Sequence, residues 1–393
     1  MSIQFDPRAP AFRRNPYPYY DYLREHAPIF FWEVWGMNFL SRHEDCSELL
    51  RDNRLGRGAM LSDPPAAEAA LVHMQSRWML LLNPPDHTRL RGLVHKAFTP
   101  RMVEQLRGAI QRTTDQLLDQ VQPHGEMELI ADLAYPLPVT VIAEMLGVPH
   151  ADRDRFHHWS DALARSLDLT DDPMVYQRAS LAAAEFTDYL RDLSAQRRAR
   201  PTNDLLSALV QVEEAGEHLS EDELYATCAL LLVAGHETTI NLIGNGALAL
   251  LRHPEQLKLL QEQPALLHTA IEEMLRYDSP VQMTARTVLE EMEYKGQRWR
   301  RGHEVAFLLG AANHDPAVFA KPAKLDMPRD NNPHLSFGGG IHYCVGAPLA
   351  RLEGQIAFAT LLRRLPTLRL AEEQPLFRDN YVLRGLEALH LTF

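Results

Sequence analysis

The sequence predicts a mainly α-helical protein, and three observations support this fold class. Apolar residues recur with helical spacing through most of residues 102–200. A longer helical pattern covers about residues 220–252, and another covers residues 264–277. Strand patterns are short and lie near residues 29–40 and 294–303. Helical patterns therefore cover more of the sequence than strand patterns do.

Composition indicates a soluble globular protein that does not bind nucleic acid. The chain has 393 residues, of which 46% are hydrophobic and 23% are charged. Such a chain is long enough to enclose a cofactor, although length alone does not decide the number of domains. A net charge of −12 argues against a nucleic-acid partner, because phosphate binding needs clustered lysine and arginine.

The cysteines and the apolar runs predict a cytoplasmic location. Cys46, Cys228 and Cys344 are odd in number and far apart, which is not a disulfide framework and fits a reducing compartment. The N-terminal residues lack an apolar signal core. The longest apolar run, residues 228–234, is far shorter than the ~20 residues that cross a bilayer. We expect no membrane insertion.

The N-terminal part begins with a predicted helix at residues 16–24 and a hairpin around Gly36. Residues 57–79 show no clean period and predict a long irregular loop. A helix then covers residues 86–97, where His87 and Arg91 are four residues apart and share one face. By pattern alone this face is either a solvated basic surface or an anion site.

The helical region 102–200 is interrupted at residues 123–125, 147–149 and 171–173, where proline or glycine occurs. Within it, residues 156–159 read Phe-His-His-Trp. Adjacent side chains on a helix point about 100° apart, so both histidines do not reach one ion. We therefore do not expect a metal site there.

The long helix predicted at residues 220–252 has a recognisable N-terminal cap and an unexpected glycine in its middle. Ser220 and Glu223 form a predicted capping box. Gly235 lies in the helix interior, where glycine costs ~1 kcal/mol in stability relative to alanine. It occurs there either by chance or because the structure requires a glycine at this position. Thr238 can return its hydroxyl to an upstream carbonyl and open a groove for a small ligand.

The following helix contains Glu273 and Arg276, which are three residues apart and can pair. On a surface such a pair contributes little to stability. If it were buried and joined by a further charge, removing one partner would cost several kcal/mol.

The most informative stretch is residues 337–346, Phe-Gly-Gly-Gly-Ile-His-Tyr-Cys-Val-Gly. Its glycines predict a tight turn with a close backbone approach. Pro348 then marks a helix start, which places Cys344 where free N–H groups and the helix dipole favour a thiolate. A thiolate in such a loop is a candidate soft metal ligand, although a lone cysteine is more often a small buried hydrophobe.

Taken together, these strings resemble the cytochrome P-450 family over about residues 15–393. The loop 337–346 is similar to the family's haem-binding loop, and Ala-Gly-His-Glu-Thr at 234–238 is similar to its oxygen-binding motif. His-Thr-x-x-Arg at 87–91, the Glu273–Arg276 pair with Arg329, and Ala-Asn-His-Asp-Pro at 312–316 also match, the last with His314 in place of arginine.

The resemblance implies a role for each matching residue. Cys344 would be the axial thiolate of haem b. Glu237 and Thr238 would be an acid–alcohol pair that delivers protons during dioxygen activation, and Glu273, Arg276 and Arg329 would be a buried structural triad. The haem contacts would be His87, Arg91, Ala234, Arg286, Phe337, His342, Cys344 and Gly346.

The resemblance further implies one prism-shaped, mainly α domain over residues 1–393, with small β-sheets. The reaction would be that of a haem-thiolate monooxygenase, which inserts one oxygen atom of O2 into an organic substrate. No glycine-rich flavin or nicotinamide fingerprint occurs. Electrons would therefore come from a ferredoxin or flavodoxin with its reductase, docked on the Cys344 side through Lys96, Arg101 or Arg351.

The substrate is the least determined feature. The expected pocket segments are mainly apolar and predict a hydrophobic substrate: 60–80, 156–185, 230–238, 280–284 and 380–386, including Met79, Leu169, Leu231, Met283 and Leu383. Residues 234–243 and 279–286 resemble a bacterial subgroup of macrolide and polyketide hydroxylases and the biotin-pathway enzyme that oxidises fatty acyl chains on acyl carrier protein. A fatty acyl chain and a polyketide-, macrolide- or terpenoid-like molecule both remain open.

Two other classes of protein are compatible with parts of the pattern. A haem-based sensor or carrier would not need the Glu237–Thr238 pair. A non-haem fold with a structural cysteine would lack haem absorption after purification.

Overall fold

The computed structural model describes residues 6–7, 9–58, 64–167, 172–212 and 216–393. The chain divides into two compact units. One, here unit 1, comprises residues 1–56, 114–136 and 238–393, and the other, unit 2, comprises residues 57–113 and 137–237. The division falls inside one helix, α12 (Glu221–Leu251), between Glu237 and Thr238.

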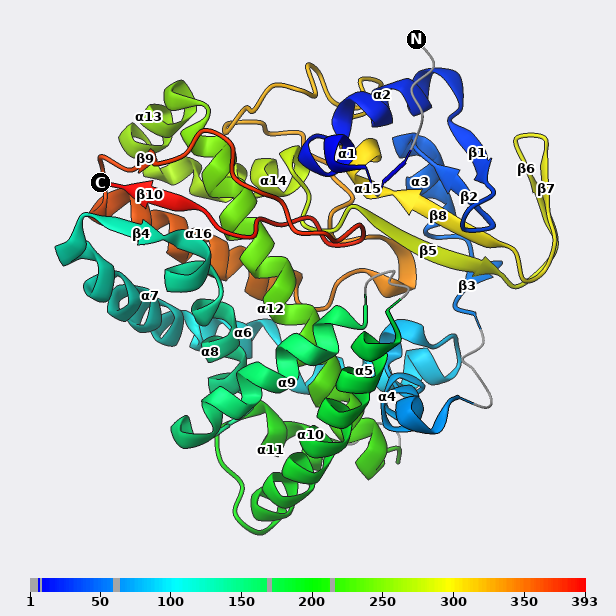
Figure 1. Ribbon diagram of the computed structural model, residues 1–393. Coiled ribbons are helices and arrows are strands. Elements are labelled where there is room, and N and C mark those ends of the chain that lie inside the picture. The colour runs from blue at the N-terminus through cyan, green and yellow to red at the C-terminus, as the bar shows by residue number, and fades with distance from the viewer. Residues whose placement is uncertain (1–5, 8, 59–63, 168–171, 213–215) are drawn as a thin grey trace. The chain divides into compact units, whose positions relative to one another are not determined.

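Unit 1 contains the sheets. A five-stranded sheet has the order β1-β2-β8-β5-β3, in which β2 and β8 are parallel and the other neighbours are antiparallel (Figure 1). The smaller sheets are β4-β10-β9 and the hairpin β6-β7. The strands are β1 (Ile29–Trp32), β2 (Met37–Leu40), β3 (Leu55–Gly56), β4 (Glu126–Glu128), β5 (Met283–Val288), β6 (Met292–Tyr294), β7 (Gln297–Trp299), β8 (Glu304–Leu308), β9 (Arg369–Leu370) and β10 (His390–Thr392).

The remaining named elements of unit 1 are helical. They are α1 (Pro10–Arg14), α2 (Tyr17–His26), α3 (His43–Leu49), η3 (Gln122–His124), η4 (Ile130–Ala134), α13 (Pro254–Glu262), η6 (Pro264–Leu266), α14 (Leu267–Tyr277), α15 (Leu309–Ala312), η7 (Gly340–His342) and α16 (Ala347–Arg364). One apolar cluster joins Leu40, Val305 and Phe307 of the sheet to Leu49 of α3 and Leu335, which precedes the Cys344 loop.

The named elements of unit 2 are all helices among the residues that the structure describes. Its elements are η1 (Ala66–Glu68), α4 (Ala69–Gln75), η2 (Met79–Leu81), α5 (Asp86–Ala97), α6 (Pro100–Gln105), η5 (His150–Asp152), α9 (Arg153–Arg165), α10 (Pro173–Ala199) and α11 (Leu205–Gln211), with parts of α7 (Arg107–Val121), α8 (Pro136–Met145) and α12. The mainly α fold class is confirmed.

Several local predictions are confirmed. Strands β1 and β2 pair around Gly36, whose φ of 64° explains the glycine in the turn. At the start of α12 the Ser220 amide donates to Glu223 Oε2 at 2.8 Å, and the Glu223 amide donates to Ser220 Oγ at 3.3 Å, as the capping box predicts.

The expectation of an irregular loop over residues 57–79 was wrong in part. Residues 59–63 lie outside the described part, but α4 covers Ala69–Gln75. This helix packs on α10, with Leu71 and Met74 buried. Tertiary packing therefore stabilises a segment whose own pattern is weak.

Among the described helices, α12 is long and apolar enough to cross a bilayer by length and composition, yet 72% of its most apolar window is buried. Such burial is typical of the core helix of a soluble protein. Gly235 has a structural reason in unit 2, because a Cβ there would lie 2.6 Å from Ile142 Cδ1 of α8.

Candidate functional site

The loop before α16 is closed by its own backbone. The Cys344 amide donates to the Phe337 carbonyl at 3.0 Å, and the Tyr343 amide donates to the Gly340 carbonyl at 3.1 Å. Gly340 has a φ of 65°, and a Cβ there would lie 2.3 Å from the Leu50 carbonyl oxygen. Only glycine fits this approach, so the loop lies directly on the end of α3.

Cys344 differs from the other two cysteines in its environment. Cys46 and Cys228 are fully buried, while Cys344 is exposed at the start of α16. Burial raises the pKa of the Cys46 thiol, and raises the pKa of Cys228 to about 12. Neither buried cysteine is suited to be a thiolate, which leaves Cys344 as the candidate ligand.

Unit 1 holds most of the other candidate residues. Phe337, His342 and Gly346 lie on the same loop as Cys344, and a Cβ at Gly346 would lie 3.8 Å from Cys344 Sγ. Arg286 lies on β5, is buried, and donates from Nη1 to the Ala285 carbonyl at 2.8 Å. Thr238 is half-buried in α12.

Unit 2 holds His87, Arg91, Ala234 and Glu237. His87 is buried and Arg91 is half-buried on α5, four residues apart as predicted. Ala234 is exposed in the middle of α12, although the residues on its N-terminal side, Leu232 and Val233, are buried.

Glu237 has a neighbour that the sequence did not single out. His236 is fully buried, with Nδ1 2.9 Å from Ser160 Oγ of α9 and 3.0 Å from the Leu232 carbonyl oxygen. Its Nε2 lies 4.0 Å from Glu237 Oε1. Glu237 therefore adjoins an anchored imidazole.

The predicted triad is confirmed in unit 1. Arg276 Nε donates to Glu273 Oε2 at 2.8 Å, and Arg276 Nη2 donates to Oε1 at 2.8 Å. Arg329 Nε donates to Oε2 at 2.9 Å. Glu273 and Arg276 are fully buried, so this is a structural network and not a surface pair.

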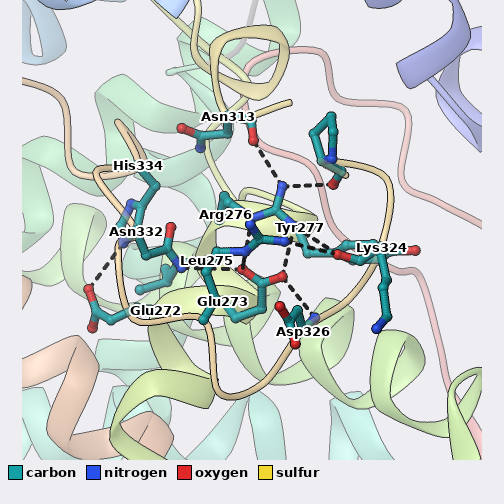
Figure 2. Close-up of polar contacts among 12 residues, drawn as sticks. Glu272, Glu273, Leu275, Arg276, Tyr277, Asn313, Lys324, Asp326, Asn332 and His334 are labelled. Atoms are coloured by element: carbon teal, nitrogen blue, oxygen red, sulfur yellow. Dashed lines mark hydrogen bonds and ion pairs between the residues drawn. The ribbon is translucent and has the colours of Figure 1, made fainter. Parts of the chain in front are cut away.

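The same network ties down the segment before the loop. Arg276 Nη1 donates to the Asn313 and Pro322 carbonyls, both at 2.9 Å, and the Asp326 amide donates to Glu273 Oε1 at 2.9 Å (Figure 2). Asn332 Nδ2 also donates to Glu273, at 3.2 Å. Residues 313–332 are thereby fixed to α14.

Sequence reasoning missed Asn313 as a hub. Its Nδ2 donates to Ser279 Oγ at 2.7 Å and to Ser336 Oγ at 2.9 Å, and its Oδ1 accepts from the Leu335 amide at 2.7 Å. The Ala-Asn-x-Asp-Pro string at 312–316 was the available signal. Its variant residue His314 is buried and stacks on Tyr17 with centroids 4.0 Å apart; burial lowers its pKa to about 3.

Arg351 does not have the free charge expected of a docking residue. Its guanidinium donates from Nε and Nη2 to the two carboxylate oxygens of Glu272, both at 2.7 Å. Lys96 and Arg101 are exposed, as a docking role would require.

Glu353, also on α16, is a buried acid that no motif assigned to chemistry. Thr239 Oγ1 donates to its Oε2 at 3.4 Å, and no described residue hydrogen-bonds to its Oε1. Burial raises the pKa of Glu353 to about 8, although the Thr239 bond opposes the rise.

Of the expected pocket residues, Leu169 and residues 60–63 lie outside the described part. Met283 and Leu383 are buried, and Leu383 forms an isolated bridge with Val281. Met79 and Leu231 are half-buried.

Comparison with known proteins agrees with these features. Residues 11–385 match the family Cytochrome P450. The chain is 42% identical over 396 residues to the biotin biosynthesis cytochrome P450 of Bacillus subtilis, with both chains covered completely. It is 42% identical over 404 residues to the polyketide biosynthesis cytochrome P450 PksS of the same organism, covering 99% of this chain and 98% of the other.

A solved structure is similar in fold as well. P450BioI in complex with hexadec-9Z-enoic acid ligated acyl carrier protein superposes with a TM-score of 0.93 at 42% identity, covering 98% of this chain and 99% of that one. The chain belongs to the cytochrome P450 family. It is a haem-thiolate monooxygenase that binds haem b through a cysteine thiolate and depends on a redox partner.

The residues present fit that cofactor. Among the described residues no cluster of three or more His, Cys, Asp or Glu side chains is arranged to hold a metal ion by itself. The exposed thiol of Cys344, just before α16, would supply the protein's ligand to a haem iron.

Proposed function

We propose that Cys344 is the axial haem ligand of a single-domain monooxygenase, residues 1–393, that oxidises a fatty acyl chain carried on acyl carrier protein. The environment of Cys344 supports the ligand assignment. Cys344 has an exposed thiol just before α16, whereas Cys46 and Cys228 are buried. His87, Arg91, Arg286 and His342 would bind the anionic edge of the haem, and Ala234, Phe337 and Gly346 would contact its faces.

Bound haem supplies the iron at which dioxygen is activated. The protein's own task is to control protons and water. The Glu237 side chain is 15% exposed, so its carboxylate can exchange protons with solvent. The half-buried Thr238 hydroxyl, next along α12, would take the proton onward at Oγ1.

Electrons would come from a ferredoxin or flavodoxin with its reductase in the cytoplasm. Lys96 and Arg101 are exposed basic residues suited to an acidic partner. Arg351 is ion-paired within the chain, which weakens the case for including it.

The acyl substrate is supported by two relatives. One is named for biotin biosynthesis, and the solved complex contains a fatty acid linked to acyl carrier protein. A polyketide substrate is the second candidate, because PksS is named for polyketide biosynthesis and has the same 42% identity.

An optical titration of the ferric protein separates these candidates. A low-spin to high-spin shift with hexadecenoyl acyl carrier protein, at concentrations where the free acid and macrolides give none, would support the acyl proposal. A shift with macrolides alone would refute it in favour of the second candidate. Absence of a haem Soret band would refute the role of Cys344.

A further inference from the structure

The ion pair between Arg351 and Glu272 has a geometry that depends on arginine. Two parallel N–H groups of the guanidinium meet the two carboxylate oxygens, each at 2.7 Å. A planar fork satisfies a carboxylate in this way, whereas an ammonium group makes only point contacts. Burial raises the pKa of Glu272, but hydrogen bonds from Arg351 and His334 outweigh it and lower the pKa to about 2. The pair is therefore charged at neutral pH.

The same guanidinium lies on the aromatic residues that flank Cys344. Arg351 Cζ is 4.5 Å from the centroid of the Phe337 ring, and Nη1 is 3.5 Å from the Tyr343 hydroxyl oxygen. The Phe337 carbonyl accepts the Cys344 amide at 3.0 Å. Arg351 thus contacts residues on both sides of the cysteine.

Glu272 also reaches the segment that enters the loop. Its Oε2 lies 3.1 Å from His334 Nε2 (Figure 2). The His334 ring lies 5.8 Å from the Phe337 ring. One carboxylate on α14 therefore links the chain before the loop to the helix after it.

We propose that Arg351, oriented by Glu272, is a positioning residue for the Cys344 thiolate that acts through Phe337 and Tyr343, and that it is not a docking residue for the electron donor. The inference rests on the proposed role of Cys344 as haem ligand. Because the guanidinium is already neutralised by Glu272, its contribution is geometric, and the arginine fork is required.

The test compares Arg351→Lys, Arg351→Gln and Glu272→Gln with Arg364→Lys as the matched control. Arg364 lies on the same helix and pairs with Asp115 and Asp119, about 20 Å further along α16 at 1.5 Å per residue. Two quantities are measured. They are the haem midpoint potential without any partner, and the concentration of a two-iron ferredoxin that gives half the maximal reduction rate.

Positioning predicts that Arg351→Lys shifts the midpoint potential as Arg351→Gln does, since lysine keeps the charge but loses the fork. Glu272→Gln should shift it too, although the Arg351 charge remains. In all three variants the half-saturating ferredoxin concentration should change less than twofold. Arg364→Lys should leave both quantities unchanged.

Docking predicts the opposite pattern and would overturn the inference. In that case lysine restores wild-type behaviour, and Arg351→Gln raises the half-saturating concentration tenfold or more at an unchanged potential. Circular dichroism and haem content per chain confirm that each variant is folded and loaded. A wild-type protein without thiolate–haem absorption would instead refute the proposed function, which separates the two failures.

Discussion

Replacing Glu353 by glutamine should change how stability depends on pH. The carboxyl is buried in unit 1, and its one hydrogen bond among the described residues, from Thr239, is long at 3.4 Å. Burial raises its pKa from 4.5 to about 8. Glutamine has nearly the same shape and can still accept that bond, but it does not titrate.

The sign follows from proton binding. The folded state holds the Glu353 proton more tightly than the unfolded state does, so its stability contribution is complete below pH 4.5 and is lost as the pH rises towards 8. Between pH 5.5 and 8 the loss comes to about 3 kcal/mol. For 393 residues the entropy of unfolding is roughly 0.8 kcal/mol/K, so the corresponding change in Tm is about 4 °C.

The assay is thermal melting of the haem-loaded protein, followed by circular dichroism from pH 5.5 to 8. The Tm of Glu353→Gln minus that of wild type should rise by about 4 °C over this range. Glu255→Gln, an exposed acid on α13, serves as the control and should show a constant difference. A pH-independent difference for Glu353→Gln would show that the carboxyl reaches solvent, which would refute the reasoning.

Three further predictions test the site. Cys344→Ser should retain the helix content but lose thiolate-type haem absorption. If the variant retained that absorption, a residue other than Cys344 would be the haem ligand. Thr238→Ala should lower product formed per reducing equivalent by about 10-fold or more and release peroxide instead, as a peroxide assay would show, and unchanged coupling would count against the proton role. Glu273→Gln should destabilise the protein by about 3–5 kcal/mol in thermal melts, because it breaks a buried network, and a cost below about 1 kcal/mol would indicate solvent access.

Features with a local cause were predictable from the sequence. The hairpin around Gly36 pairs residues 29–32 with residues 37–40, and the capping box joins Ser220 to Glu223, three positions further along. The helix α16 begins next to Pro348, as the pattern predicts. In contrast, α4 was missed because its stability comes from packing on α10, over a hundred residues further along the chain.

The site divides in the same way. The spacing of the motifs identified Cys344 and the Glu273–Arg276–Arg329 triad as candidates. The structure contains the hydrogen bonds expected within the triad. Asn313 and Glu272 were not identified as structural hubs, because their partners lie 22 to 79 residues away. Nothing in the local sequence around such a polar residue indicates which residue far along the chain it will hydrogen-bond to.

The two adjacent carboxylates of α14 explain how a glycine-rich loop can hold a ligand. Ordering glycine is entropically costly, so the loop needs restraints from outside itself. Neighbouring side chains on a helix point about 100° apart. Glu273 accordingly binds Arg276 and residues 326–332, and Glu272 binds His334 (Figure 2). Glu272 also binds Arg351. The chain is thus fixed to one helix both before and after Cys344, which adds to the restraints from the loop's own backbone and from the end of α3.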